Sequence, residues 1–429
     1  MRAVACATTG EDRRFIATEP PVKQREWRRS YLLAALTLLI VLMAIEVIGR
    51  VGLLVVPSLI GMPSRTAREI LREQTERIGR LLAPDSLRRE EIDAELGWRY
   101  RAGFSKGTDY INRQGTRNLR VYASSPPSEA IRVAVFGDSF VYGNEVGTAD
   151  SWPTQLEVDD PRFEVPNYGV GGYGADQALL RYRRDGAALH PQIVVLGFTP
   201  DDLRRVVNVY RRFIDDREWP LAKPRFLLDG SSGLRLIPSP LLRAADYERL
   251  RVQPKHVREL GRHDAWYAPE IYDNPLFDWS GAVRLASVIV VRLREHFIGQ
   301  NRLLKGDVFN TEAEAFRIQE AIFRQFAAEV ERNGARPLIV FLPDAGSLAK
   351  ARAHRLTPYA PLAAALRQTG IDYVDMAPAF IAAPDHEHWS SYFMPGGHYS
   401  PRGNAIVAAA IAPALRARVP SRAAGSKLH

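Results

Sequence analysis

The sequence predicts an α/β protein in which helices cover both faces of a doubly wound parallel sheet, giving three layers. Three apolar runs rich in β-branched residues carry this prediction: residues 131–136, 193–197 and 337–342. Runs of this length and composition are typical of strands that are buried on both faces. Helical spans separate the runs, and strands that alternate with helices form parallel sheets.

The spacing of apolar residues predicts the helices between these strands. They cover residues 151–158, 175–188, 311–333, 361–368 and 402–417, and two short strands are expected at 163–165 and 373–374. Residues 204–305 form a long insertion between the second and third long strands. It contains a predicted hairpin that turns between Gly230 and Gly233, and an amphipathic helix over 281–297. We expect the insertion to form a lid or a side subdomain.

Residues 31–48 form an apolar stretch of eighteen residues with one acid, Glu46. As a helix this stretch would be about 27 Å long, which is just enough to cross a bilayer core. Basic residues precede it, so the positive-inside rule keeps the N-terminus in the cytoplasm. These residues are Lys23, Arg25, Arg28 and Arg29. The sequence therefore predicts an uncleaved anchor, and a cleaved signal peptide or a buried soluble helix is the alternative.

The expected domain organisation follows from these segments. It comprises a cytoplasmic tail (1–30), a transmembrane anchor (31–56), a juxtamembrane helix and lead-in (57–125), the α/β domain with its insertion (126–419) and a disordered tail (420–429). The juxtamembrane helix is predicted over residues 64–82, where apolar residues fall near one face. The linker into the α/β domain is the Ser- and Pro-rich stretch 124–127.

The net charge of +9 does not indicate a nucleic-acid-binding protein. Residues 1–30 and the last fifteen residues carry most of it, and the body of the chain is close to neutral. A nucleic-acid groove requires basic residues clustered on a folded surface. The chain has one cysteine, Cys6, in the expected cytoplasmic tail, so the exported part contains no thiol.

Gly137-Asp138-Ser139 follows directly after the first long strand. It therefore lies at the carboxyl end of that strand, where open α/β sheets bind ligands. A serine at this place can act as a nucleophile if a base and an oxyanion site face it. The alternative is that Asp138 or Ser139 merely caps the following helix.

Two further motifs supply what a nucleophilic serine needs. The turn at residues 167–174, NYGVGGYG, contains glycines that let backbone amides approach a ligand closely. His398 precedes the last helix, which Ser400 as N-cap and Pro401 as first residue begin. His398 is therefore the candidate general base.

Together these motifs resemble the GDSL/SGNH hydrolase family over residues 92–417, in its membrane-anchored bacterial form. The lead-in Leu96-Gly97-Trp98-Arg99 and Ile111-Asn112 adds to the resemblance. The resemblance implies that Ser139 is the nucleophile, that the amides of Ser139 and Gly172 bind the oxyanion, and that His398 is the base. It also implies a serine hydrolase or deacylase that acts on acyl esters, with no cofactor and no metal.

The resemblance and the anchor together give an expected location and substrate class. The catalytic domain is expected on the periplasmic side of a bacterial inner membrane, held by a single N-terminal span. The substrate class is an O-acylated carbohydrate, a lipid or a small ester, and an envelope glycan suits the location best. Membrane and acyl-ester substrate are the expected partners, and nucleic acid is not.

Two positions depart from the family pattern. Asp201 follows the second long strand, where the third sequence motif of the family normally has an asparagine that faces the oxyanion, so it is a candidate oxyanion or substrate residue. Gly396 and Pro395 stand where an acid normally orients the histidine. Candidate replacements for that acid are Asp344, Asp375, Asp385 and Glu387. Without one of them, the sequence implies a Ser139–His398 dyad.

Other functions remain as alternatives. The two departures favour a catalytically impaired binding or scaffold protein for envelope polysaccharide, and an O-acyltransferase is a third possibility. His386 and His388 beside Asp385 are too few and too close for a convincing metal site. Asp201-Asp202 lacks the partner that paired glycosidase carboxylates need. Nucleotide-binding fingerprints are absent from the sequence.

Overall fold

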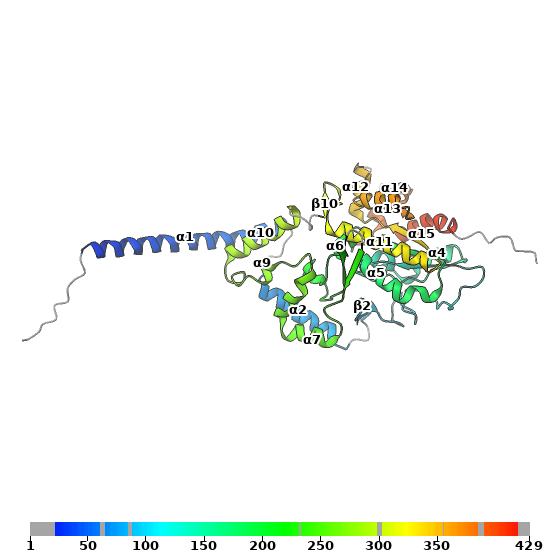
Figure 1. Cartoon of the computed structure of the whole chain (residues 1–429), viewed down its shortest axis with the longest axis horizontal. Coiled ribbons are helices and arrows are strands. Elements are labelled where there is room, and N and C mark those ends of the chain that lie inside the picture. Colours follow the sequence, from blue (N-terminus) through cyan, green and yellow to red (C-terminus); the bar gives the residue numbers. More distant parts are fainter. Residues whose placement is uncertain are drawn as a thin grey trace, which may run out of the picture.

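The computed structural model describes residues 22–60, 65–84, 88–230, 233–297, 303–354, 356–384 and 390–418 (Figure 1). The expected tail at 420–429, most of the tail at 1–30 with Cys6, and the cluster of Asp385, His386, Glu387 and His388 lie outside the described residues.

A parallel sheet forms the centre of the α/β domain. Among the described residues it has five strands in the order β13-β12-β7-β5-β6. These are β5 (Ile131–Phe136), β6 (Phe163–Glu164), β7 (Ile193–Phe198), β12 (Arg336–Phe341) and β13 (Tyr373–Asp375). The chain begins in the middle of the sheet and winds first to one side and then to the other. The predicted doubly wound sheet is therefore confirmed.

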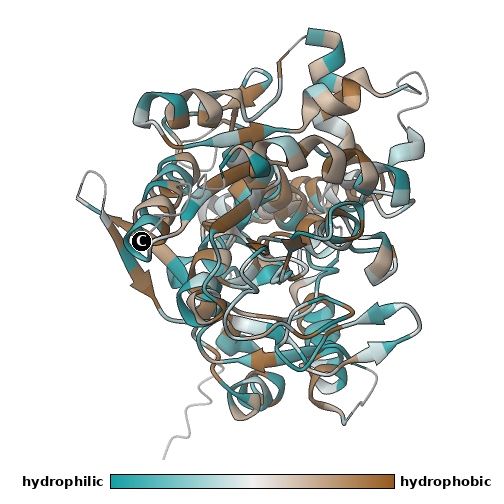
Figure 2. Cartoon of the chain, turned by 90° about the vertical axis from the view of Figure 1, so that its right-hand side faces the viewer, coloured by the Kyte–Doolittle hydropathy of each residue, from teal (hydrophilic) through white to brown (hydrophobic). Residues whose placement is uncertain are grey.

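Helices cover both faces of this sheet because alternate strand residues point to opposite sides. Ala134 and Phe136 pack under one helical layer, while Val133 and Val135 pack under the other. The first layer contains α5 (Ala175–Arg181), α11 (Glu314–Arg332) and α13 (Ala360–Thr369). The second contains α4 (Trp152–Asp159), α12 (Ala345–His354), α14 (Ala377–Ala382) and α15 (Pro401–Arg416). Figure 2 shows the apolar strands between these helices.

The doubly wound order places a switch point between β5 and β7. From β5 the chain crosses to β6 on one side, and it then returns to add β7 on the other side. In such sheets the crossover connections diverge at this point, which leaves a crevice beyond the carboxyl ends of the two strands. The Gly137-Asp138-Ser139 turn stands at this crevice.

The insertion contains the expected hairpin, β8 (Arg225–Asp229) with β9 (Gly233–Ile237), and several helices. These include α7 (Ala244–Val252), α8 (Val257–Leu260), α9 (Pro269–Tyr272) and α10 (Gly281–Phe297). They pack on the juxtamembrane helix α2 (Ala67–Leu82), and buried residues of both helices, such as Tyr247 of α7 and Ile78 of α2, form one cluster.

The lead-in contributes two small antiparallel pairs: β1 (Glu90–Asp93) with β2 (Gly97–Tyr100), and β3 (Ser105–Lys106) with β4 (Asp109–Tyr110). A third such pair, β10 (Leu304–Lys305) with β11 (Val308–Phe309), lies at the end of the insertion.

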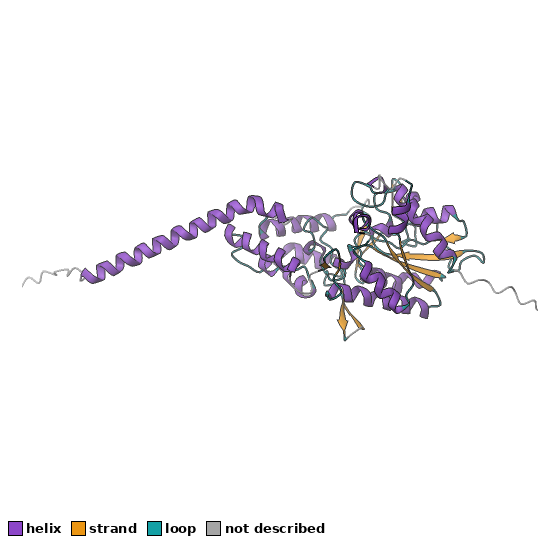
Figure 3. Ribbon diagram, turned by 90° about the horizontal axis from the view of Figure 1, so that it is seen from above, coloured by secondary structure: helices purple, strands orange, loops and turns teal. Residues whose placement is uncertain are grey.

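The N-terminal helix α1 (Val22–Ile60) projects away from the α/β domain (Figures 1 and 3). Within the described residues it is the one helix long and apolar enough to cross a membrane, over Glu26–Val56. Almost none of its most apolar stretch is buried against the rest of the chain. This finding is compatible with a membrane anchor or with a signal sequence.

Candidate active site

Ser139 begins the short helix α3 (Ser139–Tyr142) immediately after β5. Asp138 caps this helix, and its Oδ1 accepts the amide of Phe140 at 2.8 Å. Gly137 has a φ of 154°, and a Cβ there would lie 2.5 Å from Val141 Cγ2. The tight turn therefore requires glycine, and it presents a buried serine at the rim of the sheet.

His398 faces Ser139 from the loop before α15. The distance between His398 Nε2 and Ser139 Oγ is 2.9 Å, which is a hydrogen bond. Ser400 fixes the end of this loop, because its hydroxyl accepts the amide of Gly403 at the start of α15. The structure thus brings together the two predicted catalytic residues from positions 259 residues apart.

Glu145 takes the place of the orienting acid that the sequence pattern lacks. Its Oε2 lies 2.6 Å from His398 Nδ1 and also accepts the amide of His398 at 3.1 Å. Its Oε1 accepts the amide of Gly396 at 2.7 Å. The geometry therefore gives a Ser139–His398–Glu145 triad instead of the expected dyad. Hydrogen bonding at Nδ1 assigns the imidazole proton to that nitrogen and leaves Nε2 free to accept from Ser139.

None of the four acids considered from the sequence takes this role among the described residues. Asp375 accepts from the Tyr359 hydroxyl at 2.8 Å and from the amide of Ala377 at 2.9 Å. Asp344 accepts the amide of Ser347 at 2.7 Å. Asp385 and Glu387 lie outside the described residues.

The surroundings of Glu145 keep it ionised. Burial raises the pKa of this carboxyl, but hydrogen bonds from the His398 side chain, the His398 amide and the Gly396 amide lower it by more. The net pKa lies below the ordinary value for glutamate. A carboxylate in contact with Nδ1 stabilises the imidazolium that forms when Nε2 takes a proton.

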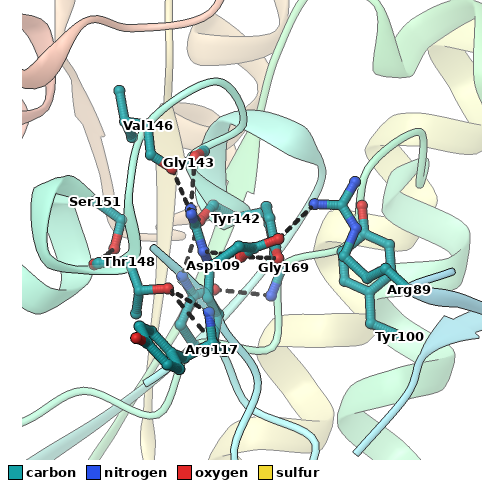
Figure 4. Close-up of polar contacts among 12 residues, drawn as sticks. Arg89, Tyr100, Asp109, Arg117, Tyr142, Gly143, Val146, Thr148, Ser151 and Gly169 are labelled. Carbon is teal, nitrogen blue, oxygen red and sulfur yellow. Dashed lines mark hydrogen bonds and ion pairs between the residues drawn. The ribbon is translucent and has the colours of Figure 1, made fainter. Parts of the chain in front are cut away.

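Arg117, from the lead-in, holds the loop that carries Glu145 (Figure 4). Its buried guanidinium donates to the carbonyls of Tyr142 and Gly143 at 2.5 Å each and of Val146 at 2.6 Å. Asp109 accepts from Arg117 Nε at 3.2 Å and from the Tyr142 hydroxyl at 2.5 Å. Glu145 itself has a φ of 68°, a left-handed conformation that costs a non-glycine residue about 1–3 kcal/mol. The Arg117 contacts on both sides of Glu145 stabilise this conformation.

The Gly-rich turn lies beside Ser139 as expected. Gly172 has a φ of 78°, and Arg211 Nη1 donates to its carbonyl at 2.6 Å. The Gly172 amide has no acceptor in the part of the chain that the structure describes. The Ser139 amide belongs to the first turn of α3, where amides lack intrahelical partners. Both amides can therefore donate to an oxyanion in the pocket.

Asp201 lines the pocket, but its carboxylate is paired with arginines. It lies 3.1 Å from Arg204 Nε and 3.2 Å from Arg205 Nη2. Burial raises the pKa of Asp201, yet the positive charges of Arg205, Arg204 and Arg211 outweigh this effect and lower it. An ionised carboxylate repels an oxyanion, so this geometry favours a structural role for Asp201 over direct oxyanion binding.

Asn144 is a pocket residue that sequence reasoning did not single out. It precedes Glu145, its amide donates to the Ser139 carbonyl at 2.9 Å, and its side chain lines the pocket with Gly171 and Gly172. Its Oδ1 is buried without a partner among the described residues. Position 201, where the family has an asparagine, is an aspartate in this chain. Asn144 thus brings a side-chain amide to the pocket from another position.

Ser139 and His398 open into a cavity of about 500 Å³. Trp219, with 41% of its surface exposed, lines it, and so do Trp98, Arg211 and Glu218. The Arg211 guanidinium lies over the Trp98 ring and pairs with Glu218 at 2.7 Å. The cavity thus combines aromatic surface with fixed charges. Nowhere in the described ranges do three His, Cys, Asp or Glu side chains form a group that could hold a metal.

Residues 303–428 match the family model described as "SGNH hydrolase-like domain, acetyltransferase AlgX". The C-terminal part of the chain is therefore similar to an SGNH hydrolase-like domain. The matched part of this SGNH-like domain includes His398 and the strands β12 and β13. A search of curated proteins found no match.

Solved structures of GDSL proteins share low identity with the chain. A putative lipolytic protein of the G-D-S-L family from Desulfitobacterium hafniense is 15% identical, covering 66% of this chain and 98% of that one, with a TM-score of 0.33. A GDSL-like lipase from Bacteroides thetaiotaomicron is 13% identical, covering 69% and 93%, with a TM-score of 0.33.

Replacing Gly396 by alanine is expected to lower kcat about tenfold or more with little loss of stability. A Cβ at this position would lie 2.5 Å from Glu145 Oε1, so the carboxylate would have to move away from His398. Gly397→Ala is the matched control. A Cβ there meets nothing within 4 Å, although its φ of 95° adds backbone strain. Steady-state kinetics measure kcat for both variants. An equal loss of kcat in Gly396→Ala and Gly397→Ala would contradict this role of Gly396.

Proposed function

We propose that the SGNH-like domain is a serine esterase that cleaves acyl esters through Ser139, His398 and Glu145. The observation that carries the proposal is the continuous hydrogen-bonded chain from Ser139 Oγ through His398 to Glu145, with distances of 2.9 and 2.6 Å. Nucleophile, base and orienting acid in contact are the arrangement that serine hydrolases of unrelated folds share.

The reaction follows from this geometry. His398 Nε2 takes the Ser139 proton as Oγ attacks the acyl carbonyl carbon, and the amides of Ser139 and Gly172 stabilise the oxyanion. When the intermediate collapses, the C–O bond to the alcohol breaks and the alcohol takes the proton from His398. Water then attacks the acyl-serine by the same route, releasing the carboxylic acid and restoring Ser139.

An acylated sugar suits the cavity better than a simple lipid ester. Trp219 is exposed beside charged and polar groups, and an aromatic face next to hydrogen-bonding groups fits the apolar face and hydroxyls of a pyranose. We therefore expect an O-acylated glycan as substrate.

Replacing Trp219 by alanine is expected to raise KM for an acetylated oligosaccharide about tenfold, or about 1.4 kcal/mol. The same change should leave KM for p-nitrophenyl acetate within about twofold of wild type, because that ester has no sugar ring to stack on Trp219. Val158→Ala, at an apolar residue exposed on α4, is the control. An equal effect on both substrates would contradict a sugar-binding role for Trp219.

We further infer that α1 anchors the enzyme in a bacterial inner membrane with the SGNH-like domain on the periplasmic side. The apolar helix and the basic residues before it support this topology. A C-terminal reporter that is active only in the periplasm tests it. If a reporter that is active only in the cytoplasm were active at the same position, the SGNH-like domain would lie on the cytoplasmic side and the proposed topology would be wrong.

Labelling with a fluorophosphonate tests the catalytic proposal directly. The full chain should be labelled at Ser139, Ser139→Ala should not be labelled, and the exposed control Ser105→Ala should behave like wild type. If wild type were labelled no more than Ser139→Ala, the proposal of a serine esterase would be wrong. It would favour the alternative of a catalytically impaired binding protein.

Acyl transfer to a glycan is the second candidate function. The family that residues 303–428 resemble includes an acetyltransferase, AlgX, and the acyl-serine can be attacked by a sugar hydroxyl as well as by water. Mass spectrometry of an acceptor oligosaccharide, incubated with the enzyme and an activated acetyl ester, separates the two. Acetylated acceptor indicates transfer, whereas free acetate alone indicates hydrolysis.

A further inference from the structure

Glu46, the single acid in the apolar stretch of α1, binds the beginning of α10. Its carboxylate accepts from the Ser280 hydroxyl and from the Gly281 amide, each at 2.7 Å. Arg50 pairs with Glu46 at 2.7 Å and donates to the Trp279 carbonyl at 3.3 Å. The acid therefore stabilises the N-terminal end of α10 instead of facing solvent alone.

From this point α10 runs alongside the C-terminal part of α1, in the same direction (Figures 1 and 3). A Cβ at Gly49 would lie 2.3 Å from Ala282 Cα, and one at Gly52 would lie 2.5 Å from Leu285 Cδ2. Glycines at such contacts let two helices approach closely, a feature typical of helix pairs within membranes.

The apolar part of α1 is longer than one bilayer crossing requires. The candidate span, Glu26–Val56, has 31 residues and would be about 46 Å long, compared with about 30 Å for a hydrocarbon core. The surplus lies in the part of α1 that accompanies α10. This part exposes large apolar side chains, including Val51, Leu54, Val55 and Leu59.

The helix α10 also has an exposed apolar face. Val288 and Val291 are buried against α2 and α9, and Ala282 and Leu285 face α1. Val290, Leu293 and Phe297 are instead 47%, 47% and 60% exposed. With Ala286, their spacing of four, three and four residues places them on one stripe. At the beginning of α10, Trp279 is 67% exposed and Leu276 is 56% exposed.

We propose that this stripe, Ala286-Val290-Leu293-Phe297, is embedded in the outer leaflet of the bilayer that α1 spans. The helices α1 and α10 pack side by side and both expose large apolar side chains, so lipid that surrounds the end of α1 would also reach the stripe. Because α10 runs in the same direction as α1, Trp279 would lie toward the bilayer centre and the end of the stripe would lie nearest the phospholipid headgroups, where Arg292 suits the boundary. The proposal rests on the proposed anchoring by α1.

Embedding α10 would fix the SGNH-like domain close to the membrane surface. The anchor already contacts the domain where α1 packs on α10, and contact of the stripe with lipid would add a second attachment to the bilayer. The α10 part of the insertion would then be a membrane-docking element, while Arg211, Glu218 and Trp219 of the same insertion line the active-site cavity.

Depth-dependent fluorescence quenching tests this proposal in the full chain. Cys6→Ser removes the one native thiol, and Leu293→Cys or Phe297→Cys then places a single environment-sensitive NBD label on the stripe. Glu331→Cys, on the exposed end of α11, is the control. The proteins are reconstituted in vesicles of phosphatidylcholine and phosphatidylglycerol that contain lipids with a doxyl group near the headgroup. Labels at 293 and 297 should lose at least half of their emission, and the label at 331 should lose almost none.

Each other outcome overturns the proposal in an identifiable way. Vesicle flotation with equal, weak quenching at 293 and 331 leaves the anchor intact and places the stripe in water. Blue-shifted emission without quenching at 293 shows that a second copy of the chain covers the stripe. Failure to float overturns the anchor together with the docking of α10. Fluorophosphonate labelling of the same samples reports the catalytic proposal independently of all three.

Discussion

Glu145→Gln is expected to lower kcat for ester hydrolysis by about 10³ to 10⁴ while leaving the fold intact. The carboxylate holds the proton of His398 on Nδ1, so that Nε2 can accept from Ser139. A glutamine amide can donate to Nδ1 and so stabilises the wrong tautomer, and it carries no charge to stabilise the imidazolium. In other serine triads the corresponding change costs about 10⁴. Hydrolysis of p-nitrophenyl acetate measures the effect.

Glu218→Gln is the matched control for this change. Glu218 lines the same cavity and pairs with Arg211, but it does not contact His398. We expect its kcat to stay within about tenfold of wild type. A Glu145→Gln enzyme that turns over as fast as Glu218→Gln would show that Ser139 and His398 work as a dyad.

The lowered pKa of Glu145 also predicts a pH dependence of stability. A carboxyl whose pKa is lower in the folded state stabilises that state above the unfolded pKa, about 4.3 for glutamate. The contribution is lost as the pH falls through the folded pKa. The difference in unfolding free energy between wild type and Glu145→Gln should therefore be larger at pH 7 than at pH 3. Urea denaturation at both values measures it, and a constant difference would contradict the lowered pKa.

Arg117→Met is expected to have the second largest effect, on both stability and activity. The change removes the donors to the carbonyls of Tyr142, Gly143 and Val146 and one of the two arginines that pair with Asp109. We expect a loss of about 3 kcal/mol in unfolding free energy. The loop that holds Glu145 would also relax, so kcat per folded molecule should fall about 10²-fold.

Arg132→Met separates the two effects of Arg117. Arg132 is equally buried and binds Glu164 with two nitrogens, at 2.9 and 2.6 Å, but it does not touch the loop of Glu145. Its loss should destabilise the fold to a similar extent and leave kcat per folded molecule unchanged. Chemical denaturation and kinetics well below the unfolding transition give both quantities. Equal kcat values per folded molecule for Arg117→Met and Arg132→Met would show that Arg117 contributes to stability alone.

Most of the sheet could be predicted because its strands have a strong local signal. Residues in β5, β7 and β12 are apolar and β-branched, and burial on both faces removes the alternation that exposed strands show. The closeness of Ser139, Gly172 and His398 could be anticipated for a related reason. All three follow or precede elements whose ends converge at one edge of a parallel sheet.

Glu145 could not be found in the same way. Its role depends on a left-handed backbone conformation and on Arg117 from a distant segment, and neither leaves a local pattern. One signal was available in Gly396. The position where the family has an acid next to the histidine is occupied here by the residue with the least volume, and the structure fills that space with the Glu145 carboxylate. The packing of α10 on α1 is also a long-range contact that periodicity does not encode.

The position of Glu145 changes how the triad is assembled. Nucleophile and acid lie six residues apart on one short piece of chain, and only the histidine comes from elsewhere. The proposed triad therefore has two parts: residues 137–146, which are held by Arg117 and which we call the cassette, and the loop that carries His398. A graft of this cassette into a related scaffold would have to include the arginine and a glycine at the position of Gly396. It would not need the acid that normally accompanies the histidine.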